Sequence, residues 1–177
     1  MPMGTALRAH AALVTGAGRR LGLAFAEGLA ASGADVALHY GSTPGGKADA
    51  ERLRDAHGVR TVALQADLAD GRQAAELVDR AAAALGEIDL LVNSAAIFGP
   101  EGLATTTQDI WERHLAINLT APFLLCQALA RHRAGRPGVV VNILDWRALH
   151  PGQDHFAYTV SKAALAAMTQ SLAQALA

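Results

Sequence analysis

Short apolar runs alternate along the chain with longer stretches rich in alanine and leucine. The runs are "AALVTG", "DVALHY", "VRTVALQADL", "IDLLVNSA" and "GVVVNIL", and none alternates strictly between apolar and polar positions. Strands buried on both faces of a parallel sheet have this pattern, whereas the stretches between them have helical period. Repeated strand and helix in this order predicts an α/β fold, a doubly wound parallel sheet with helices on both faces.

The pattern predicts one domain over residues 1–177, because no linker, repeat or low-complexity segment divides the chain. The last stretch, "HFAYTVSKAALAAMTQSLAQALA", predicts a helix that runs to the end of the sequence. If the sheet ends with "GVVVNIL", that strand lies at an edge, although it is apolar on both sides. We then expect it to offer unpaired backbone groups.

Composition narrows the class of protein. With 177 residues, 51% of them apolar, the chain can bury a sizeable core, and no run approaches the roughly 20 apolar residues of a membrane span. Arg8 and His10 interrupt the start, so we expect no secretory signal and a cytoplasmic location. Lys and Arg number 15 against 16 Asp and Glu, which favours a small-molecule partner over nucleic acid. The lone Cys126, in "FLLCQAL", predicts a buried helical position.

The stretch "LVTGAGRRLG" follows the first predicted strand and opens a helix. Backbone N–H groups and a helix N-terminus in this context receive a pyrophosphate, although a purely structural glycine turn has the same pattern. Gly16 permits the tight turn and Gly22 permits close packing of helix on strand. Asp67 ends the third strand, where it can reach an adenine edge, and "VNSAA" ends the fourth, where ribose and nicotinamide would lie.

The end of the second strand indicates which dinucleotide is bound. Sites selective for NAD place a carboxylate there, but this strand ends in "LHYGST". Arg19, with donors nearby at His39, Tyr40, Ser42 and Thr43, instead suits a 2′-phosphate, so the sequence favours NADPH. The predicted cofactor-binding residues are Gly16, Arg19, Arg20, Leu21, Gly22, His39, Tyr40, Ser42, Asp67, Leu68, Asn93, Ser94, Ala95, Tyr158 and Lys162.

The stretch "YTVSKAAL" places Tyr158 and Lys162 four residues apart, on one face of a helix. A lysine beside a phenol favours the phenolate and lowers the tyrosine pKa, whereas a carboxylate nearby keeps the phenol protonated. Such a carboxylate, Asp145, follows the fifth strand, and Asn118 lies in a helix that can reach the same region. No metal site is expected, because His150, Asp154 and His155 form no convincing ligand set.

Taken together, these motifs resemble those of the classical short-chain dehydrogenase/reductase family, in order and approximate spacing, over nearly the whole chain. The resemblance implies a Rossmann sheet with strand order 3-2-1-4-5-6-7 and a tetrad of Asn, Ser, Tyr and Lys. Asn118, Tyr158 and Lys162 match the tetrad, but Asp145 stands where the family has serine. The resemblance to this family also implies that the sequence lacks the family's last strands. We therefore expect a truncated product that is poorly soluble or weakly active.

Four features are similar to the pteridine reductase branch: Arg20 in place of the middle glycine of the turn, Asp145, "LHY" after the second strand, and Phe98. The resemblance implies that Arg19 addresses the 2′-phosphate and Arg20 the pyrophosphate and substrate. Phe98 would sandwich a dihydropterin against nicotinamide, and a C=N bond would be reduced. The predicted catalytic residues are Asp145, Tyr158, Lys162, which holds ribose, and Asn118, which anchors a water; the predicted substrate-binding residues are Arg20, Phe98, Asp145 and Tyr158.

Alternatives remain at this stage. Phe98 also suits ordinary loop packing, and Asp145 suits a capping carboxylate. Two other functions also suit the sequence. One is that of a generic carbonyl reductase or alcohol dehydrogenase, and the other is that of a non-catalytic dinucleotide-binding fragment. The helices containing residues 118–131 and 158–177 pack across a two-fold axis in the family, which implies a dimer or tetramer, whereas packing within one chain explains the same apolar residues.

Overall fold

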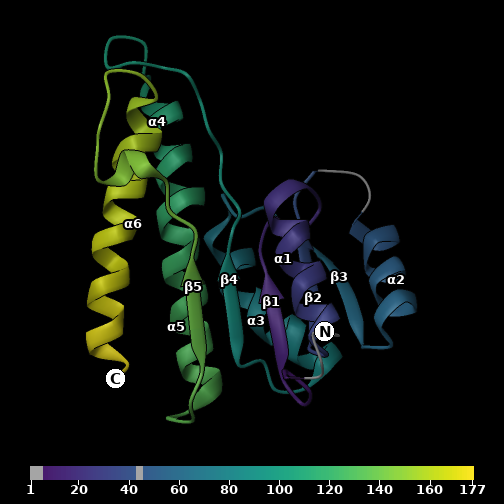
Figure 1. Cartoon of the computed structure of the whole chain (residues 1–177). Coiled ribbons are helices and arrows are strands. Elements are labelled where there is room, and N and C mark those ends of the chain that lie inside the picture. The colour runs from purple at the N-terminus through teal and green to yellow at the C-terminus, as the bar shows by residue number, and fades with distance from the viewer. Residues whose placement is uncertain (1–5, 43–45) are drawn as a thin grey trace.

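The computed structural model describes residues 6–42 and 46–177, so Thr43 lies outside the described residues. Five parallel strands form one sheet in the order β3-β2-β1-β4-β5 (Figure 1). The strands are β1 (Ala11–Val14), β2 (Asp35–Tyr40), β3 (Thr61–Gln65), β4 (Leu90–Asn93) and β5 (Val139–Asn142). The predicted fold class is confirmed, and the strand order agrees with the first five positions of the expected order.

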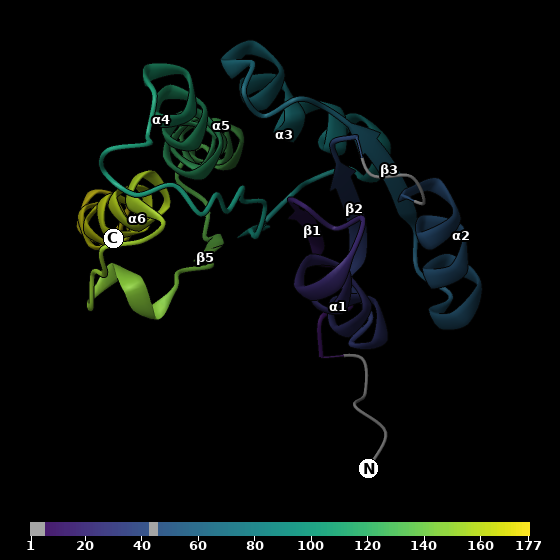
Figure 2. The ribbon, with the colours of Figure 1, turned by 90° about the horizontal axis from the view of Figure 1, so that it is seen from above.

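Helices cover both faces of the sheet. Helices α1 (Arg20–Ala31) and α2 (Gly46–His57) lie on one side, whereas α3 (Gly71–Leu85), α4 (Gln108–Leu115), α5 (Ala121–Arg133) and α6 (Phe156–Ala175) lie on the other (Figure 2). Successive residues of a strand point to opposite faces. In β1, Leu13 therefore packs into the core under α3 and α5, and Val14 into the core under α1 and α2. Burial on both faces explains why these strands lack an alternating pattern.

Helices α4 and α5 are joined by one π-helical turn, η1 (Ala116–Thr120), which no sequence pattern predicted. The π turn contains Asn118, which is buried, and such turns occur often at functional sites. Cys126 is buried in α5, as predicted. Among the helices of the described ranges, none combines the length and apolarity needed to span a bilayer.

Strand β5 lies at the edge of the sheet, as the sequence indicated. Val140 packs against the core under α3 and α5, but Val139 and Val141 point to the other face and are 52% and 43% exposed. Helix α6 covers only the first of these faces. The predicted dimer or tetramer and the predicted cytoplasmic location stay predictions.

A close approach of two glycines holds α1 against the turn that follows β1. A Cβ atom added at Gly22 would lie 2.3 Å from the carbonyl oxygen of Gly16, well inside van der Waals contact. Gly28, two turns further along the same helix, has nothing within 4 Å of such an atom. The two glycines of α1 therefore differ in kind: one is required by packing and the other is not.

We predict that Gly22→Ala lowers the free energy of unfolding by about 2 kcal/mol or more, because the methyl group must displace backbone rather than a flexible side chain. Gly28→Ala is the matched control, and it should raise stability by about 0.5 to 1 kcal/mol through helix propensity. Urea unfolding of both variants checks this. Equal effects of the two substitutions would contradict the packing argument.

Candidate functional site

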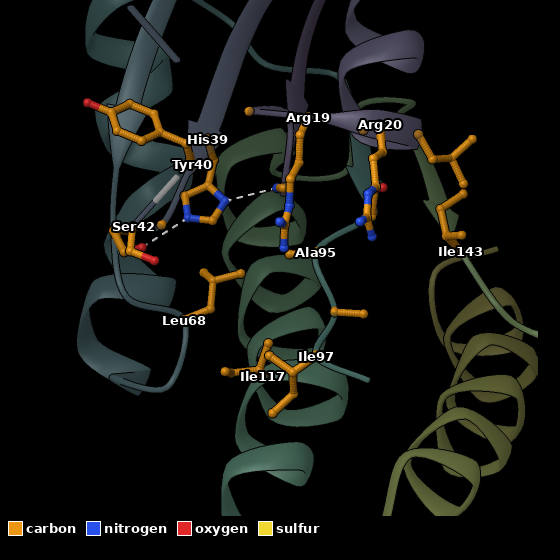
Figure 3. Close-up of a pocket in the computed structure, with 18 of the residues that line it drawn as sticks. Arg19, Arg20, His39, Tyr40, Ser42, Leu68, Ala95, Ile97, Ile117 and Ile143 are labelled. Atoms are coloured by element: carbon orange, nitrogen blue, oxygen red, sulfur yellow. Dashed lines mark hydrogen bonds between the residues drawn. The ribbon is translucent and has the colours of Figure 1, made fainter. Parts of the chain in front are cut away.

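A pocket of about 910 Å³ opens at the carboxyl ends of the strands. It lies where the chain order reverses between β1 and β4, the usual ligand site of an open α/β sheet. Figure 3 shows side chains from the glycine turn, β2, the loop after β4 and η1 gathered around it. Of the predicted site residues, those that line it are Gly16, Arg19, Arg20, Leu21, Gly22, His39, Tyr40, Ser42, Asp67, Leu68, Ser94, Ala95, Asp145, Tyr158 and Lys162.

The glycine turn is locked to the end of β4. The Thr15 hydroxyl oxygen accepts hydrogen bonds from the N–H groups of Ser94 and Ala95, at 3.0 and 3.1 Å. A Cβ at Gly16 would lie 2.8 Å from the Cα of Ala95, so the two backbones meet without space for a side chain. Gly16 also has a φ of +67°, a value that glycine adopts without strain. The floor of the pocket is therefore bare backbone.

Helix α1 presents an uncapped N-terminus to this pocket. Its N-cap, Arg19, makes no side-chain capping hydrogen bond, and the first turn contains no acidic residue. The first N–H groups of such a helix are free to bind an anion. Arg19 and Arg20 are exposed, and their side chains extend from the turn in the same direction (Figure 3). Two cations, a helix N-terminus and a bare backbone floor fit the phosphates of a dinucleotide.

Arg20 adopts a left-handed backbone conformation, with a φ of +50°. This conformation costs a residue with a Cβ roughly 1 kcal/mol, and glycine avoids the cost. The middle glycine of the family's turn corresponds to this position. The chain therefore carries a guanidinium group at a place where the backbone favours glycine.

His39 has a different role from the one predicted. Its Nδ1 accepts from the N–H of Gly16 at 3.1 Å, and its Nε2 donates to the carbonyl oxygen of Ala66 at 3.2 Å. The imidazole is 2% exposed, and burial lowers its pKa to about 4. Since both nitrogens are bonded within the protein, His39 is no phosphate donor. It is a neutral brace between the glycine turn and β3.

Tyr40 and Ser42 were expected to donate hydrogen bonds to the cofactor, and Asp67 to accept one. The Tyr40 ring packs against Gly46 at the start of α2, and its hydroxyl points away from the two arginines (Figure 3), so its expected role as a phosphate donor stays a prediction. Ser42 is exposed at the pocket. Asp67 is also exposed there, and its Oδ1 accepts from the N–H of Ala69 at 3.0 Å.

Asn93 lies inside the sheet rather than at the pocket wall, contrary to the prediction. It is 2% exposed, and its Nδ2 donates to Asn142 Oδ1 at 2.8 Å and approaches Cys126 Sγ at 3.6 Å. Asn142 in turn donates to the Thr169 hydroxyl at 2.9 Å. This polar chain ties β4 to β5 and α6 beneath the pocket, so Asn93 supports the site without lining it.

The structure brings Tyr158 and Asp145 together. The tyrosine hydroxyl donates to Asp145 Oδ2 at 3.1 Å, and Asp145 Oδ1 accepts from the N–H of Arg147 at 2.9 Å. Asp145 is the N-cap of a short 3-10 helix, η2 (Trp146–Ala148). The two interpretations of Asp145, as a capping residue and as a partner of Tyr158, therefore both hold, one for each carboxylate oxygen.

Charge around Tyr158 keeps the phenol protonated. Burial, then the hydrogen bond and negative charge of Asp145, raise the Tyr158 pKa well above its usual value. Burial lowers the pKa of Lys162 to about 8, and its Nζ donates to the carbonyl oxygen of Ile143 at 2.7 Å. Nζ lies 5.8 Å from the centre of the Tyr158 ring. The ammonium thus bonds the Ile143 carbonyl rather than the phenol, whereas Asp145 acts on the phenol directly, and the catalytic roles expected of these residues stay predictions.

Asn118 is fully bonded within the protein. Its Oδ1 accepts from the N–H of Ile97 at 2.9 Å, and its Nδ2 donates to the Ile97 carbonyl and the Ser161 hydroxyl, each at 3.0 Å. Ser161 Oγ donates to the Tyr158 carbonyl at 2.7 Å. The side chain thus joins the loop after β4 to the helix of Tyr158, and the predicted role of Asn118 in anchoring a water stays a prediction.

Phe98 lies at the rim, outside the residues that line the pocket, and its ring is 57% exposed. The ring stacks on His155, with centroids 3.8 Å apart, and meets Tyr158 edge-on at 4.6 Å. Both expectations for Phe98 remain open, because it packs in a loop and also abuts the phenol.

Sequence reasoning missed several residues of the pocket wall. Arg113 and Ile117 lie four residues apart on the continuous helical segment formed by α4 and η1. Ile143 and Leu144 follow β5 directly. Helical spacing from Asn118 could have identified Arg113 and Ile117, and the position after a parallel strand could have identified Ile143 and Leu144. Within the part of the chain that the structure describes, no group of three His, Cys, Asp or Glu side chains could hold a metal ion.

Comparison with known proteins now gives the family. The short chain dehydrogenase family matches residues 10–177, so the chain belongs to that family. The L-rhamnose 1-dehydrogenase (NAD(P)(+)) of Sphingomonas sp. (strain SKA58) is 33% identical over 172 residues, which is 96% of this chain and 68% of that protein. An uncharacterized oxidoreductase of Thermotoga maritima is 32% identical, with 66% of its length covered. The chain thus spans about two thirds of the length of these relatives.

Solved structures are similar over the same span. The FolM alternative dihydrofolate reductase 1 of Brucella canis, complexed with NADP, has a TM-score of 0.91 and 37% identity over 97% of this chain and 68% of its own. A blue fluorescent protein from a metagenomic library, in complex with NADPH, has a TM-score of 0.88 and 39% identity over 96% and 70%. The cofactor predicted from the sequence is the one these two structures contain.

The buried His39 gives a prediction for pH. Its pKa is about 4 in the folded chain against 6.5 for the ordinary side chain, so the unfolded chain binds the extra proton between these values. The stabilisation by neutral His39 is complete above pH 6.5 and is lost as the pH falls toward 4, by roughly 3 kcal/mol. His39→Gln, which cannot titrate, should flatten the unfolding free energy across this window. Identical slopes for the two proteins would refute the assignment.

Proposed function

We propose that the chain binds NADPH and reduces a C=N bond of a dihydropterin such as dihydromonapterin, dihydrobiopterin or dihydrofolate. The observation that carries the proposal is the hydrogen bond from the Tyr158 hydroxyl to Asp145 Oδ2. Burial already raises the pKa of the phenol, and a carboxylate, unlike a serine, adds a hydrogen bond and a negative charge that raise it further. The site is then built around a neutral tyrosine acid.

The cofactor residues divide by the part of NADPH that they suit. Arg19 suits the 2′-phosphate, with Ser42 beside it, and Arg20 with the N-terminus of α1 suits the pyrophosphate and the substrate. Asp67 can accept from the adenine edge, with Leu68 and Ile117 as apolar walls. Lys162, held by the Ile143 carbonyl, suits the nicotinamide ribose. When bound, NADPH supplies the hydride.

The chain's own contribution is the proton. Tyr158 donates its hydroxyl proton to a ring nitrogen, and Asp145 accepts a hydrogen bond from the phenol or from a substrate N–H group. An imine nitrogen is a stronger base than a carbonyl oxygen, so it can take a proton from a phenol whose pKa is raised. A flat, polar ring also suits the aromatic edge at Phe98 better than a small ketone does.

A second candidate is reduction of a carbonyl group, or oxidation of an alcohol, because several relatives carry the names of sugar dehydrogenases. One is the probable galactose dehydrogenase GalD of Rhizobium meliloti, 33% identical over 168 residues, with 66% of its length covered. On that hypothesis Asp145 substitutes for the family's serine without a role in substrate choice. The two candidates therefore differ in what replacement of Asp145 does.

The test is NADPH oxidation by the purified chain with a dihydropterin, beside a panel of small ketones and sugars. Asp145→Ser should lower pterin turnover about 100-fold, because it removes the acceptor that sets the state of Tyr158. NADPH affinity, measured by fluorescence, is the control and should hardly change. Ketone or sugar turnover alone, retained in Asp145→Ser, would move the chain to the second candidate, and NADPH binding without any turnover would indicate a non-catalytic fragment.

The two arginines give a separate prediction. Arg19→Gln should weaken NADPH binding about tenfold and leave NADH binding unchanged, because only the 2′-phosphate is affected. Arg20→Gly should weaken both cofactors alike and raise the free energy of unfolding by about 1 kcal/mol, since it relieves the left-handed φ. Fluorescence titration and urea unfolding measure these effects. A preference for NADH in Arg20→Gly and none in Arg19→Gln would reverse the assignment.

A further inference from the structure

Two loops beside Tyr158, distant in sequence, are joined side to side. His155 Nδ1 donates to the carbonyl oxygen of Gly99 at 2.7 Å, and the N–H of Phe156 donates to the carbonyl oxygen of Glu101 at 2.8 Å. The first loop follows β4 and carries Phe98, and the second joins η2 to α6. These bonds fix the position of Phe98 relative to the helix that carries Tyr158.

The His155 ring covers one face of Phe98. The two rings are nearly parallel, with 14° between their planes and 3.8 Å between centroids. The Phe98 ring then meets Tyr158 at 84°. A phenylalanine that is 57% exposed would otherwise be free to change rotamer, so the imidazole and the phenol together determine where this ring lies.

Contacts on the other side close a ring around Tyr158. The Arg147 guanidinium donates to both carboxylate oxygens of Asp154, at 2.8 and 3.1 Å, and Asp154 Oδ2 lies 3.5 Å from His155 Nε2. Arg147 also donates its backbone N–H to Asp145, the partner of Tyr158. The chain of contacts thus runs from the phenol through Asp145, Arg147, Asp154 and His155 to Phe98 and back to the phenol.

The backbone at His155 is strained, which argues against a purely local role. His155 has a φ of +53° at the N-cap of α6 and makes no side-chain capping bond within that helix. Glycine or asparagine adopts this conformation at lower cost. A histidine here provides what those residues lack, an aromatic face to place against Phe98.

We infer that His155 is a positioning residue for substrate selection: it holds Phe98 as a fixed aromatic wall beside Tyr158, which favours flat heteroaromatic substrates over aliphatic ones. The inference rests on the proposed function and deepens it. A planar ring gains stacking contact with a fixed phenylalanine, whereas a small ketone or a sugar gains little. The wall therefore acts on binding, and Tyr158 and Asp145 keep their own role in proton transfer.

Two variants separate the parts that the histidine plays. His155→Asn keeps tolerance of the left-handed backbone and an amide that can reach the Gly99 carbonyl, but it removes the ring. His155→Phe keeps the stack and removes the hydrogen bond. With a dihydropterin, His155→Asn should raise KM about three- to tenfold with kcat within about twofold, and His155→Phe should restore KM. A ketone's KM should not change in either variant.

A readout without any ligand distinguishes failure of the inference from failure of the proposed function. With fluorinated phenylalanine at the four Phe positions, the fluorine NMR signal of Phe98, assigned by its loss in Phe98→Leu, should be displaced by the neighbouring rings. It should move toward the solvent-exposed position in His155→Asn and stay in His155→Phe, where the introduced phenylalanine adds a fifth signal of its own, while Phe123 on α5 is the control.

An unmoved Phe98 signal in His155→Asn would overturn the inference, as would an unchanged KM for a dihydropterin that the wild type turns over. A wild type that neither binds nor reduces a dihydropterin contradicts the proposed function instead. In that case, a Phe98 signal that responds to His155 still supports the wall and leaves its flat ligand to be found among non-pterin heteroaromatics.

Discussion

The contact on which the rest of the site depends is the approach of α1 to the turn after β1, where Gly22 meets the carbonyl of Gly16 with no space for a methyl group. This approach aims the free N–H groups of α1 across the carboxyl ends of the strands. Two other groups hold the turn from outside. The His39 imidazole binds the N–H of Gly16 from β2, and the Thr15 hydroxyl ties the end of β4 to the turn. A buried, neutral histidine is thus part of the scaffold of the anion site. The positive charge at this site comes from Arg19 and Arg20 and not from His39.

At the other end of the pocket, burial and charge act on one phenol. Asp145 and Lys162 both lie near Tyr158, and they would shift its pKa in opposite directions if both acted at the same distance. Asp145 bonds the hydroxyl directly, whereas the Lys162 ammonium bonds the Ile143 carbonyl and lies over the ring. Burial and the carboxylate therefore both raise the pKa of Tyr158, and the phenol keeps its proton at neutral pH. The family's serine, which carries no charge, would leave burial alone to raise this pKa.

Much of the fold followed from apolar pattern alone, because strands buried on both faces lack alternation and their order is limited by right-handed crossovers. The spacing of Asp145, Tyr158 and Lys162 also predicted a cluster that the structure brings together. What the pattern could not give are roles that depend on a tertiary partner. His39 was expected to meet phosphate, but Ala66 and Gly16 occupy both its nitrogens, and the partners of Asn118 lie on a loop and a helix far away in sequence. Residue type indicates which bonds a side chain can make, and only the fold decides which of them are already made.

Backbone strain adds an argument that is independent of family resemblance. Among the described residues, four other than glycine have a positive φ: Ala9, Arg20, Ala134 and His155. The two alanines have the smallest side chain that carries a Cβ, and Ala134 ends α5 at its C-cap. Arg20 and His155 have larger side chains with polar groups, and they stand at the start of α1 and at the N-cap of α6. Left-handed residues of this kind persist where the surroundings hold them and often serve function. Since glycine would relieve both positions, the guanidinium and the imidazole are held there at a cost in stability, which the roles proposed for Arg20 at the pyrophosphate and for His155 behind Phe98 would offset.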